Sequence, residues 1–148
     1  PQIGLPIRLF MIDPAPFAED EDLTAEEQEQ LKNMRKVFIN PQIIEEEGEE
    51  WAFGEGCLSI PEVREDVFRK PQIKIEYVDE NWEKHVDTFD GLAARVIQHE
   101  YDHIEGILFT DKLSSLKKRL IKNKLASISK GKINVEYRMR FPNAKKGR

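Results

Sequence analysis

The chain has a single cysteine, Cys57, and lacks any hydrophobic stretch long enough to cross a membrane. One cysteine excludes an internal disulfide, and the absence of disulfides is typical of proteins in the reducing cytoplasm. A membrane-spanning helix needs roughly 18 to 20 consecutive apolar residues, and no signal peptide is visible at the start of the chain. We therefore expect a cytoplasmic protein that does not associate with membranes.

Positive charge is scarce ahead of the C-terminal segment. Residues 1–66 hold 17 acidic and 5 basic side chains, whereas residues 112–148 hold 13 basic side chains and one acid, Glu136. A basic segment of this kind favours a polyanionic partner such as RNA, and a solvated helix face with a tail accounts for the counts as well. The segment raises the hypothesis of ribosome contact, and nothing in the chain predicts sequence-specific DNA binding.

The 148 residues suffice for one domain with a hydrophobic core. Short apolar runs and alternating patterns predict strands over residues 7–12, 37–39, 42–51, 73–77 and 82–89, with a hairpin turn at 79–81. Residues 14–36 are predicted to be an acidic insertion containing a helix, since Thr24 and Glu27 form a capping-box pattern. Strands followed by helices, without a βαβ repeat, indicate an α+β domain with mixed or antiparallel strands.

Two helices are expected in the second half of the chain. Asp90 can cap a helix over residues 91–104, and Gly106 is suited to end it. Four residues of this helix share one face that we expect to point toward the strands packed around it: Leu92, Val96, His99 and His103. A last helix over residues 115–128, within the basic segment 114–148, is expected to bury three leucines: Leu116, Leu120 and Leu125.

The HExxH pattern that begins at His99 is the most informative feature of the sequence. His99 and His103 lie four residues apart, so on a helix their imidazoles can hold one metal ion. Glu100 lies beside them as a candidate general base for water on that metal. HExxH also occurs by chance, but two imidazoles on an inward face would be costly to bury without partners. The pattern therefore predicts the metal site of a hydrolase, with at least one ligand still to be found.

The third ligand discriminates between classes of hydrolase. A metzincin needs a histidine where this chain has Phe109, and a thermolysin-like enzyme needs a downstream glutamate, for which only Glu105 and Glu136 are present. Cys57 lies upstream, and a thiolate is a strong ligand for zinc or ferrous iron. Two alternatives stay open at this point: a peptidase of another zincin type, and a non-catalytic RNA-binding module with a structural metal.

Two motifs of the chain resemble those of a known family. The residues Glu55-Gly56-Cys57-Leu58-Ser59 and Gln98-His99-Glu100-Tyr101-Asp102-His103 resemble the EGCLS and QHExDH motifs of bacterial peptide deformylases. The likeness extends from Pro1 to about Leu113, so residues 1–148 are expected to form one catalytic domain of this type. The resemblance implies an N-formylmethionyl peptide as substrate, formate as product, and one divalent metal ion held by Cys57, His99 and His103. Fe²⁺ is favoured for activity, and Zn²⁺ or Ni²⁺ could occupy a purified sample.

The resemblance also implies roles for individual residues in catalysis. A metal-bound water attacks the formyl carbon while Glu100 acts as general acid and base. The oxyanion receives hydrogen bonds from the backbone N–H of Leu58 and the side-chain amide of Gln2. Of the family's first motif, GxGxAAxQ, only the end is present here, at Gln2. We therefore expect a longer protein in which a further segment precedes Pro1.

Other residues are expected to support the site or contact the substrate: Glu55, Gly56, Arg64, Leu92, Val96, Gln98 and Asp102. Leu92 and Val96 could line the pocket for the methionine side chain, although core packing accounts for them equally well. Arg64 either supports the site or lies on the surface. Asp102 could hold the tautomer of a ligand histidine, pair with an arginine or be solvated. His85 has no motif around it and is predicted to be an ordinary surface residue.

Overall fold

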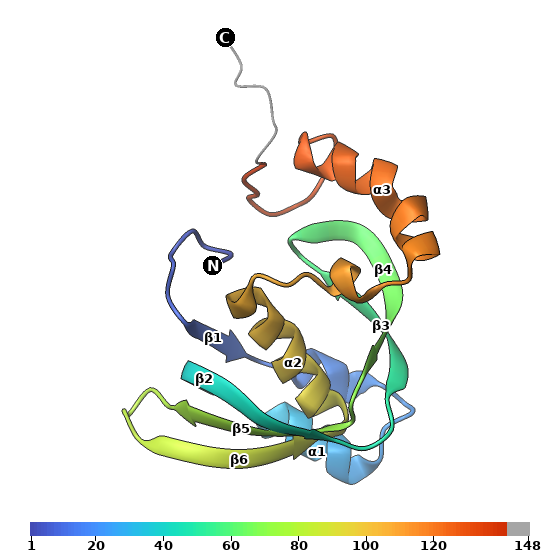
Figure 1. The fold of residues 1–148 in the computed structure, drawn as a ribbon. Coiled ribbons are helices and arrows are strands. Elements are labelled where there is room, and N and C mark those ends of the chain that lie inside the picture. Colours follow the sequence, from blue (N-terminus) through green and yellow to red (C-terminus); the bar gives the residue numbers. More distant parts are fainter. Residues whose placement is uncertain (142–148) are drawn as a thin grey trace. The chain divides into compact units, whose positions relative to one another are not determined.

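The computed structural model describes residues 1–141, so residues 142–148 of the predicted basic segment lie outside the described residues. The elements follow in the order β1 (Leu9–Ile12), η1 (Ala15–Glu19), α1 (Ala25–Asn33), β2 (Lys36–Glu47), β3 (Trp51–Cys57), β4 (Ile60–Arg69), β5 (Gln72–Val78), β6 (Lys84–Asp90), α2 (Gly91–Glu105), η2 (Phe109–Lys112) and α3 (Ser115–Ser129) (Figure 1). Strands precede the two longer helices without a βαβ repeat, so the predicted α+β class is confirmed. None of the described helices combines the length and hydrophobicity that crossing a membrane requires.

The described chain divides into two compact units. Unit 1 comprises Pro1–Trp51 and Arg69–Ile107, and unit 2 comprises Ala52–Phe68 together with the chain from Leu108 onward. Unit 1 therefore contains α2 with its HExxH pattern. Unit 2 contains all of β3 except Trp51, the EGCLS motif, β4 up to Phe68, and α3.

A four-stranded antiparallel sheet in the order β1-β2-β5-β6 forms the framework of unit 1. The predicted break at Asn40-Pro41 is wrong, because β2 continues through both residues. Asn40 has a positive φ of 49°, and the register between β2 and β5 shifts between Ile39 and Gln42. Such a bulge accommodates a proline, which has no N–H to donate to the ladder.

Helix α2 lies along this sheet in Figure 1 and is buried over much of its circumference. Ala94 and Ile97 are fully buried, and Phe38 of β2 stacks on Phe10 with ring centroids 4.8 Å apart. Gly106 ends the helix with φ 74°, as predicted, because this left-handed conformation strains residues with a Cβ. Asp90 occupies the N-cap position, but its side chain makes no capping hydrogen bond, so the capping role predicted for it is wrong.

The acidic stretch ahead of β2 contains the predicted helix, α1. Thr24 Oγ1 accepts a hydrogen bond from the Glu27 backbone N–H at 3.3 Å, and the Glu27 carboxylate accepts one from the Thr24 N–H at 2.8 Å. This reciprocal capping box confirms the predicted helix start. Hydrogen bonds from the Thr24 hydroxyl and backbone hold the pKa of Glu27 below its usual value.

Unit 2 is built on the pair of strands β3 and β4, which are joined by two residues, Leu58 and Ser59. β4 is not predicted by the sequence pattern, because five of its ten residues are charged and interrupt the apolar alternation. Its inward side chains form the core of unit 2 with residues of the C-terminal part: Ile60, Val63, Val67, Phe109, Leu113 and Ile128.

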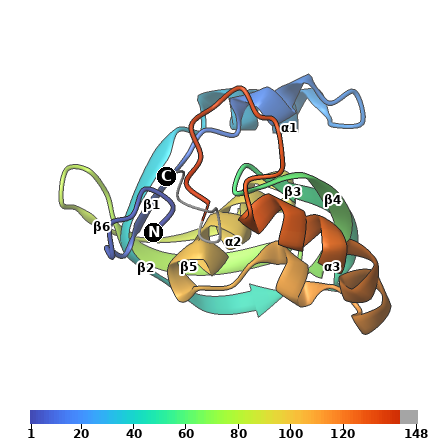
Figure 2. The same cartoon turned by 90° about the horizontal axis from the view of Figure 1, so that it is seen from above.

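Helix α3 belongs to unit 2 and is seen beside η2 in Figure 2. The prediction that Leu116 and Leu120 are buried is wrong, since they are 62% and 73% exposed. Ile121, Leu125 and Ile128 pack on the unit 2 core instead. These three residues form an i, i+4, i+7 stripe, and the small core of this unit covers only that one stripe of the helix.

Candidate active site

Helix α2 presents the two histidines of the HExxH pattern next to each other. The ring centroids of His99 and His103 are 5.0 Å apart, and the ring planes are at 89° to one another. His103 is buried and His99 is half-buried. The prediction that the helix aligns these two imidazoles is therefore confirmed by the geometry of unit 1.

Gln2 and Glu100 lie together although 98 positions separate them in the sequence. The Gln2 side-chain amide donates a hydrogen bond to Glu100 Oε2 over 3.4 Å. Glu100 is half-buried, whereas Gln2 is exposed. Unit 1 thus brings the predicted general base and one predicted oxyanion donor to the same place.

Arg8 attaches the N-terminal segment that carries Gln2 to the end of α2. Its guanidinium donates hydrogen bonds to the Pro41 carbonyl at 3.0 and 2.8 Å and to the Tyr101 hydroxyl at 3.1 Å. It also pairs with Glu105 at 2.5 Å. This role of Arg8 was not predicted, since the only local signal for it is a charged residue within an apolar run. Its contacts also give Glu105 a structural role that argues against a thermolysin-like metal ligand.

Asp102 forms a buried ion pair. Its carboxylate accepts a hydrogen bond from Arg69 Nη1 at 2.7 Å, and the two side chains are 10% and 3% exposed. Of the three roles considered for Asp102, pairing with an arginine is confirmed and solvation is excluded. Arg69 itself was missed, because no local pattern marks an arginine at the end of β4 as the partner of a residue on α2.

Gln98, Leu92 and Val96 complete the predicted residues of α2. The Gln98 side-chain amide donates to the carbonyls of Lys70, at 3.0 Å, and Ala94, at 3.2 Å, so it ties the helix to the chain that follows β4. Leu92 is buried and Val96 is half-buried. Core packing thus describes Leu92, while Val96 retains an accessible side.

The EGCLS residues occupy the end of β3 and the turn that follows, in unit 2. Glu55 is buried and Gly56 exposed, while Cys57 is half-buried and packs on the unit 2 core. Leu58 is 75% exposed, and its carbonyl accepts a hydrogen bond from the Tyr137 hydroxyl at 2.8 Å. The motif therefore comprises the last residues of β3 and the two-residue turn to β4.

Arg64 lies exposed on β4, which agrees with the surface position that was one of the two predictions for it. Its Nε would be 3.2 Å from a Cβ placed on Gly54, so the side chain crosses β3 where there is no side chain to obstruct it. Phe109, which stands where a metzincin would have a third histidine, is 1% exposed in the core of unit 2. A metzincin site is thereby excluded.

Comparison with known proteins gives a consistent result. The family model for polypeptide deformylase matches residues 1–119. The peptide deformylase of Christiangramia forsetii is 81% identical over 148 residues, which are 100% of this chain and 76% of that protein. The peptide deformylase of Flavobacterium johnsoniae is 65% identical over the same 148 residues, again 76% of that protein.

The solved structures that are similar to this chain are also peptide deformylases. A crystal structure of Arabidopsis thaliana peptide deformylase 1B with an inhibitor is 30% identical, with a TM-score of 0.72 over 88% of this chain and 66% of that one. A peptide deformylase from Legionella pneumophila is 33% identical, with a TM-score of 0.67 over 88% of this chain and 69% of that one. The chain thus spans about three quarters of the curated relatives' length and about two thirds of the solved chains'.

Peptide deformylases are metal-dependent enzymes that remove the N-formyl group from nascent peptides. The family model covers most of this chain. The QHExDH motif of the chain lies on helix α2, which places two imidazoles next to each other beside a glutamate. The chain belongs to the polypeptide deformylase family.

Proposed function

We propose that this chain hydrolyses the formyl group of N-formylmethionyl peptides and releases formate. The single observation that carries the proposal is the arrangement on α2, where His99 and His103 lie 5.0 Å apart between ring centroids. Glu100 lies between them in sequence, and the Gln2 amide contacts its carboxylate. Two metal-binding side chains, a proton acceptor and a hydrogen-bond donor are the groups that amide hydrolysis needs. Residues 1–148 then serve as one catalytic domain with an acidic insertion at 14–36, acting in the cytoplasm where new chains are made.

The donor set suits one divalent ion. Cys57 is proposed as the third ligand beside His99 and His103, because one thiolate and two imidazoles leave a coordination position open to the substrate or to water. Such donors bind Fe²⁺ and Zn²⁺ alike, and Fe²⁺ is proposed as the ion of the active enzyme. The ion would supply Lewis acidity, which polarises the formyl oxygen and lowers the pKa of water.

The protein side chains carry the proton and bind the developing charge. Glu100 accepts the proton of the attacking water and passes it to the leaving amine. The Gln2 side-chain amide and the Leu58 backbone N–H donate hydrogen bonds to the formyl oxygen as it gains negative charge. Residues proposed to contact the peptide are Glu55, Gly56, Arg64, Leu92 and Val96. Arg64 is exposed, and its proposed contact is with peptide residues beyond the methionine.

The proposed activity is tested by formate release from a formyl-Met-Ala-Ser peptide by the purified chain under anaerobic conditions. We expect turnover that disappears after chelation and returns when Fe²⁺ is added back, because the proposed Lewis acid is then removed and restored. The acetyl-Met-Ala-Ser peptide is the control and should stay intact. Release of formate at the uncatalysed rate by metal-loaded chain would contradict the proposal.

The role of Cys57 predicts a loss of metal retention in the Cys57→Ser variant. A serine hydroxyl is a poorer ligand than a thiolate, so dialysis against a chelator should remove the metal at least about tenfold faster than from the wild type. Metal content is measured by mass spectrometry of the dialysed protein. Ser59→Ala, in the same turn, is the matched control and should retain metal like the wild type. Equal retention by Cys57→Ser would remove Cys57 from the ligand set.

The basic helix α3 is proposed to contact the ribosome. Two of its lysines pair with glutamates of β4, Lys117 with Glu65 at 2.9 Å and Lys124 with Glu62. Lys118, Arg119 and Lys122 are exposed. Exposed cations on one helix favour attraction to the phosphates of ribosomal RNA.

Reversing the charge of Lys118, Arg119 and Lys122 together is expected to weaken ribosome binding. If each contacts one phosphate, the slope of log K against log salt should become less negative by about 2 to 3. Sedimentation with ribosomes at several salt concentrations measures this slope. The control reverses three exposed lysines of unit 1, namely Lys32, Lys74 and Lys84, and should leave it unchanged. Equal weakening in both triple variants would contradict a specific role for α3.

A further inference from the structure

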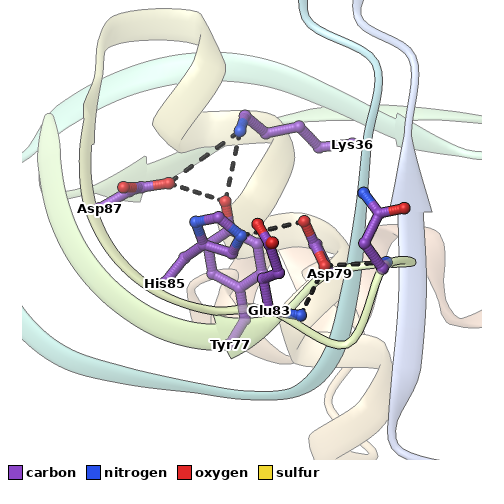
Figure 3. A network of polar contacts seen from close by, with 7 residues as sticks. Lys36, Tyr77, Asp79, Glu83, His85 and Asp87 are labelled. Atoms are coloured by element: carbon purple, nitrogen blue, oxygen red, sulfur yellow. Dashed lines mark hydrogen bonds and ion pairs between the residues drawn. The ribbon is translucent and has the colours of Figure 1, made fainter.

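A second group of metal-binding side chains lies at the hairpin between β5 and β6, within unit 1 (Figure 3). Asp79, Glu83 and His85 each offer one ligand atom, and these atoms all lie within 4.8 Å of one another. Asp79 and His85 are half-buried and Glu83 is exposed. His85 was predicted to be an ordinary surface residue, whereas in the hairpin it is half-buried and has two acidic neighbours.

Asp79 is fixed by the backbone of the turn. Its Oδ1 accepts hydrogen bonds from the backbone N–H groups of Asn81 and Glu83, both at 2.9 Å. Those bonds leave Oδ2 facing His85, whose Nε2 lies 3.0 Å away. The backbone N–H of Glu83, followed by the contact with His85, holds the pKa of Asp79 below its usual value. The turn therefore orients this carboxylate toward His85.

The imidazole of His85 is held in place by Tyr77. The two rings stack with centroids 5.2 Å apart and planes at 23°. The Tyr77 hydroxyl donates to Asp87 at 2.7 Å, and Lys36 Nζ donates to Tyr77 at 3.3 Å. Lys36 is thus directed toward Tyr77 and Asp87, which the dashed lines in Figure 3 join to its Nζ.

We propose that Asp79, Glu83 and His85 bind a divalent transition-metal ion of the zinc class, separate from the ion assigned to α2. One imidazole and two carboxylates are a donor set found in zinc sites, and water can complete the coordination. All three ligands come from seven consecutive residues in a hairpin whose strands are already paired from Gln72↔Asp90 to Val78↔Lys84. Binding therefore orders little additional chain, and an ion at this position stabilises the hairpin by mass action.

The proposal is tested on the full chain by titrating Zn²⁺ alone and recording ¹H–¹⁵N spectra. The strongest site is first filled with one equivalent of Zn²⁺, so later changes report further binding. We expect the amides of residues 79–85 and the His85 ring nitrogens to shift and to saturate with further Zn²⁺. His85→Ala and Glu83→Gln should each weaken this binding at least about tenfold. Glu83→Gln keeps the hairpin backbone and the Asp79 contacts, so it stays informative if His85→Ala disturbs the fold.

Glu80→Gln is the matched control, because Glu80 is an exposed acid of the same turn outside the ligand set. Hairpin shifts that persist at the same Zn²⁺ concentration in Glu80→Gln support the proposal. Equal weakening in Glu80→Gln and Glu83→Gln would overturn it in favour of diffuse attraction to negative charge. Absence of saturable hairpin shifts would overturn it as well. His99→Ala separates this site from the α2 site, since the hairpin shifts should persist in that variant whatever the function of α2.

Discussion

Glu100→Gln is expected to lower the rate of formate release by about 100- to 10,000-fold, the range typical of losing a general acid–base catalyst. The amide of glutamine keeps the size and polarity of the side chain but cannot take up a proton. An oxygen acceptor remains for the Gln2 amide, which lies 3.4 Å from Glu100 Oε2 in the present structure. The loss should therefore appear in kcat with little change in KM, because substrate contacts are unaffected.

Metal content distinguishes a catalytic role of Glu100 from a structural one. The Glu100→Gln variant should retain the metal of the wild type, since the imidazoles of His99 and His103 are unchanged. Glu76→Gln, at an exposed position of β5, makes the same chemical change elsewhere in unit 1 and should leave turnover intact. Turnover within tenfold of the wild type in Glu100→Gln, with metal bound, would rule out Glu100 as the proton acceptor.

Arg69→Met is expected to destabilise the protein by about 3–5 kcal/mol, because it leaves the buried Asp102 carboxylate without its cation. The pair is close, at 2.7 Å between Arg69 Nη1 and Asp102 Oδ2, and the side chains are only 3% and 10% exposed. Such a loss corresponds to a melting temperature lower by roughly 10 °C for a chain of this size. Urea denaturation followed by circular dichroism measures the change in the free energy of unfolding.

A second variant separates the pair from the packing around it. Arg69→Met combined with Asp102→Leu removes both charges, and the double variant should recover most of the stability that Arg69→Met loses. Arg35→Met is the surface control, since Arg35 is 86% exposed and lies 3.9 Å from Asp13. It should leave the urea midpoint unchanged. A single Arg69→Met variant as stable as the wild type would show that the Asp102 charge is solvated.

Local patterns in the sequence predicted much of what is local in the structure. The capping box of Thr24 and Glu27 and the end of α2 at Gly106 both follow from residues within a few positions of one another. The alignment of His99 with His103 is equally local, because a four-residue spacing places two side chains on one helix face. These features depend on helix geometry alone.

Local patterns of spacing could not identify the contacts between residues distant in the sequence. The contact of Gln2 with Glu100 joins positions 98 apart, and the pair Arg69–Asp102 joins positions 33 apart. Neither has a pattern of spacing, because the meeting of two elements depends on how strands pair and helices pack. The exposure of Leu116 and Leu120 has the same origin, since periodicity marks an apolar stripe without showing whether another element covers it.

The sequence by itself determined the chemistry that is available: two imidazoles and a glutamate on one helix, one thiol, and a basic C-terminal segment. The tertiary structure decided which of these groups has a partner. It brought the Gln2 amide into contact with the Glu100 carboxylate and paired Asp102 with Arg69. It also brought His85 into contact with the carboxylate of Asp79. The physical reason is that side-chain chemistry and helical spacing are properties of short segments, whereas burial and pairing are set by contacts between segments far apart in the chain.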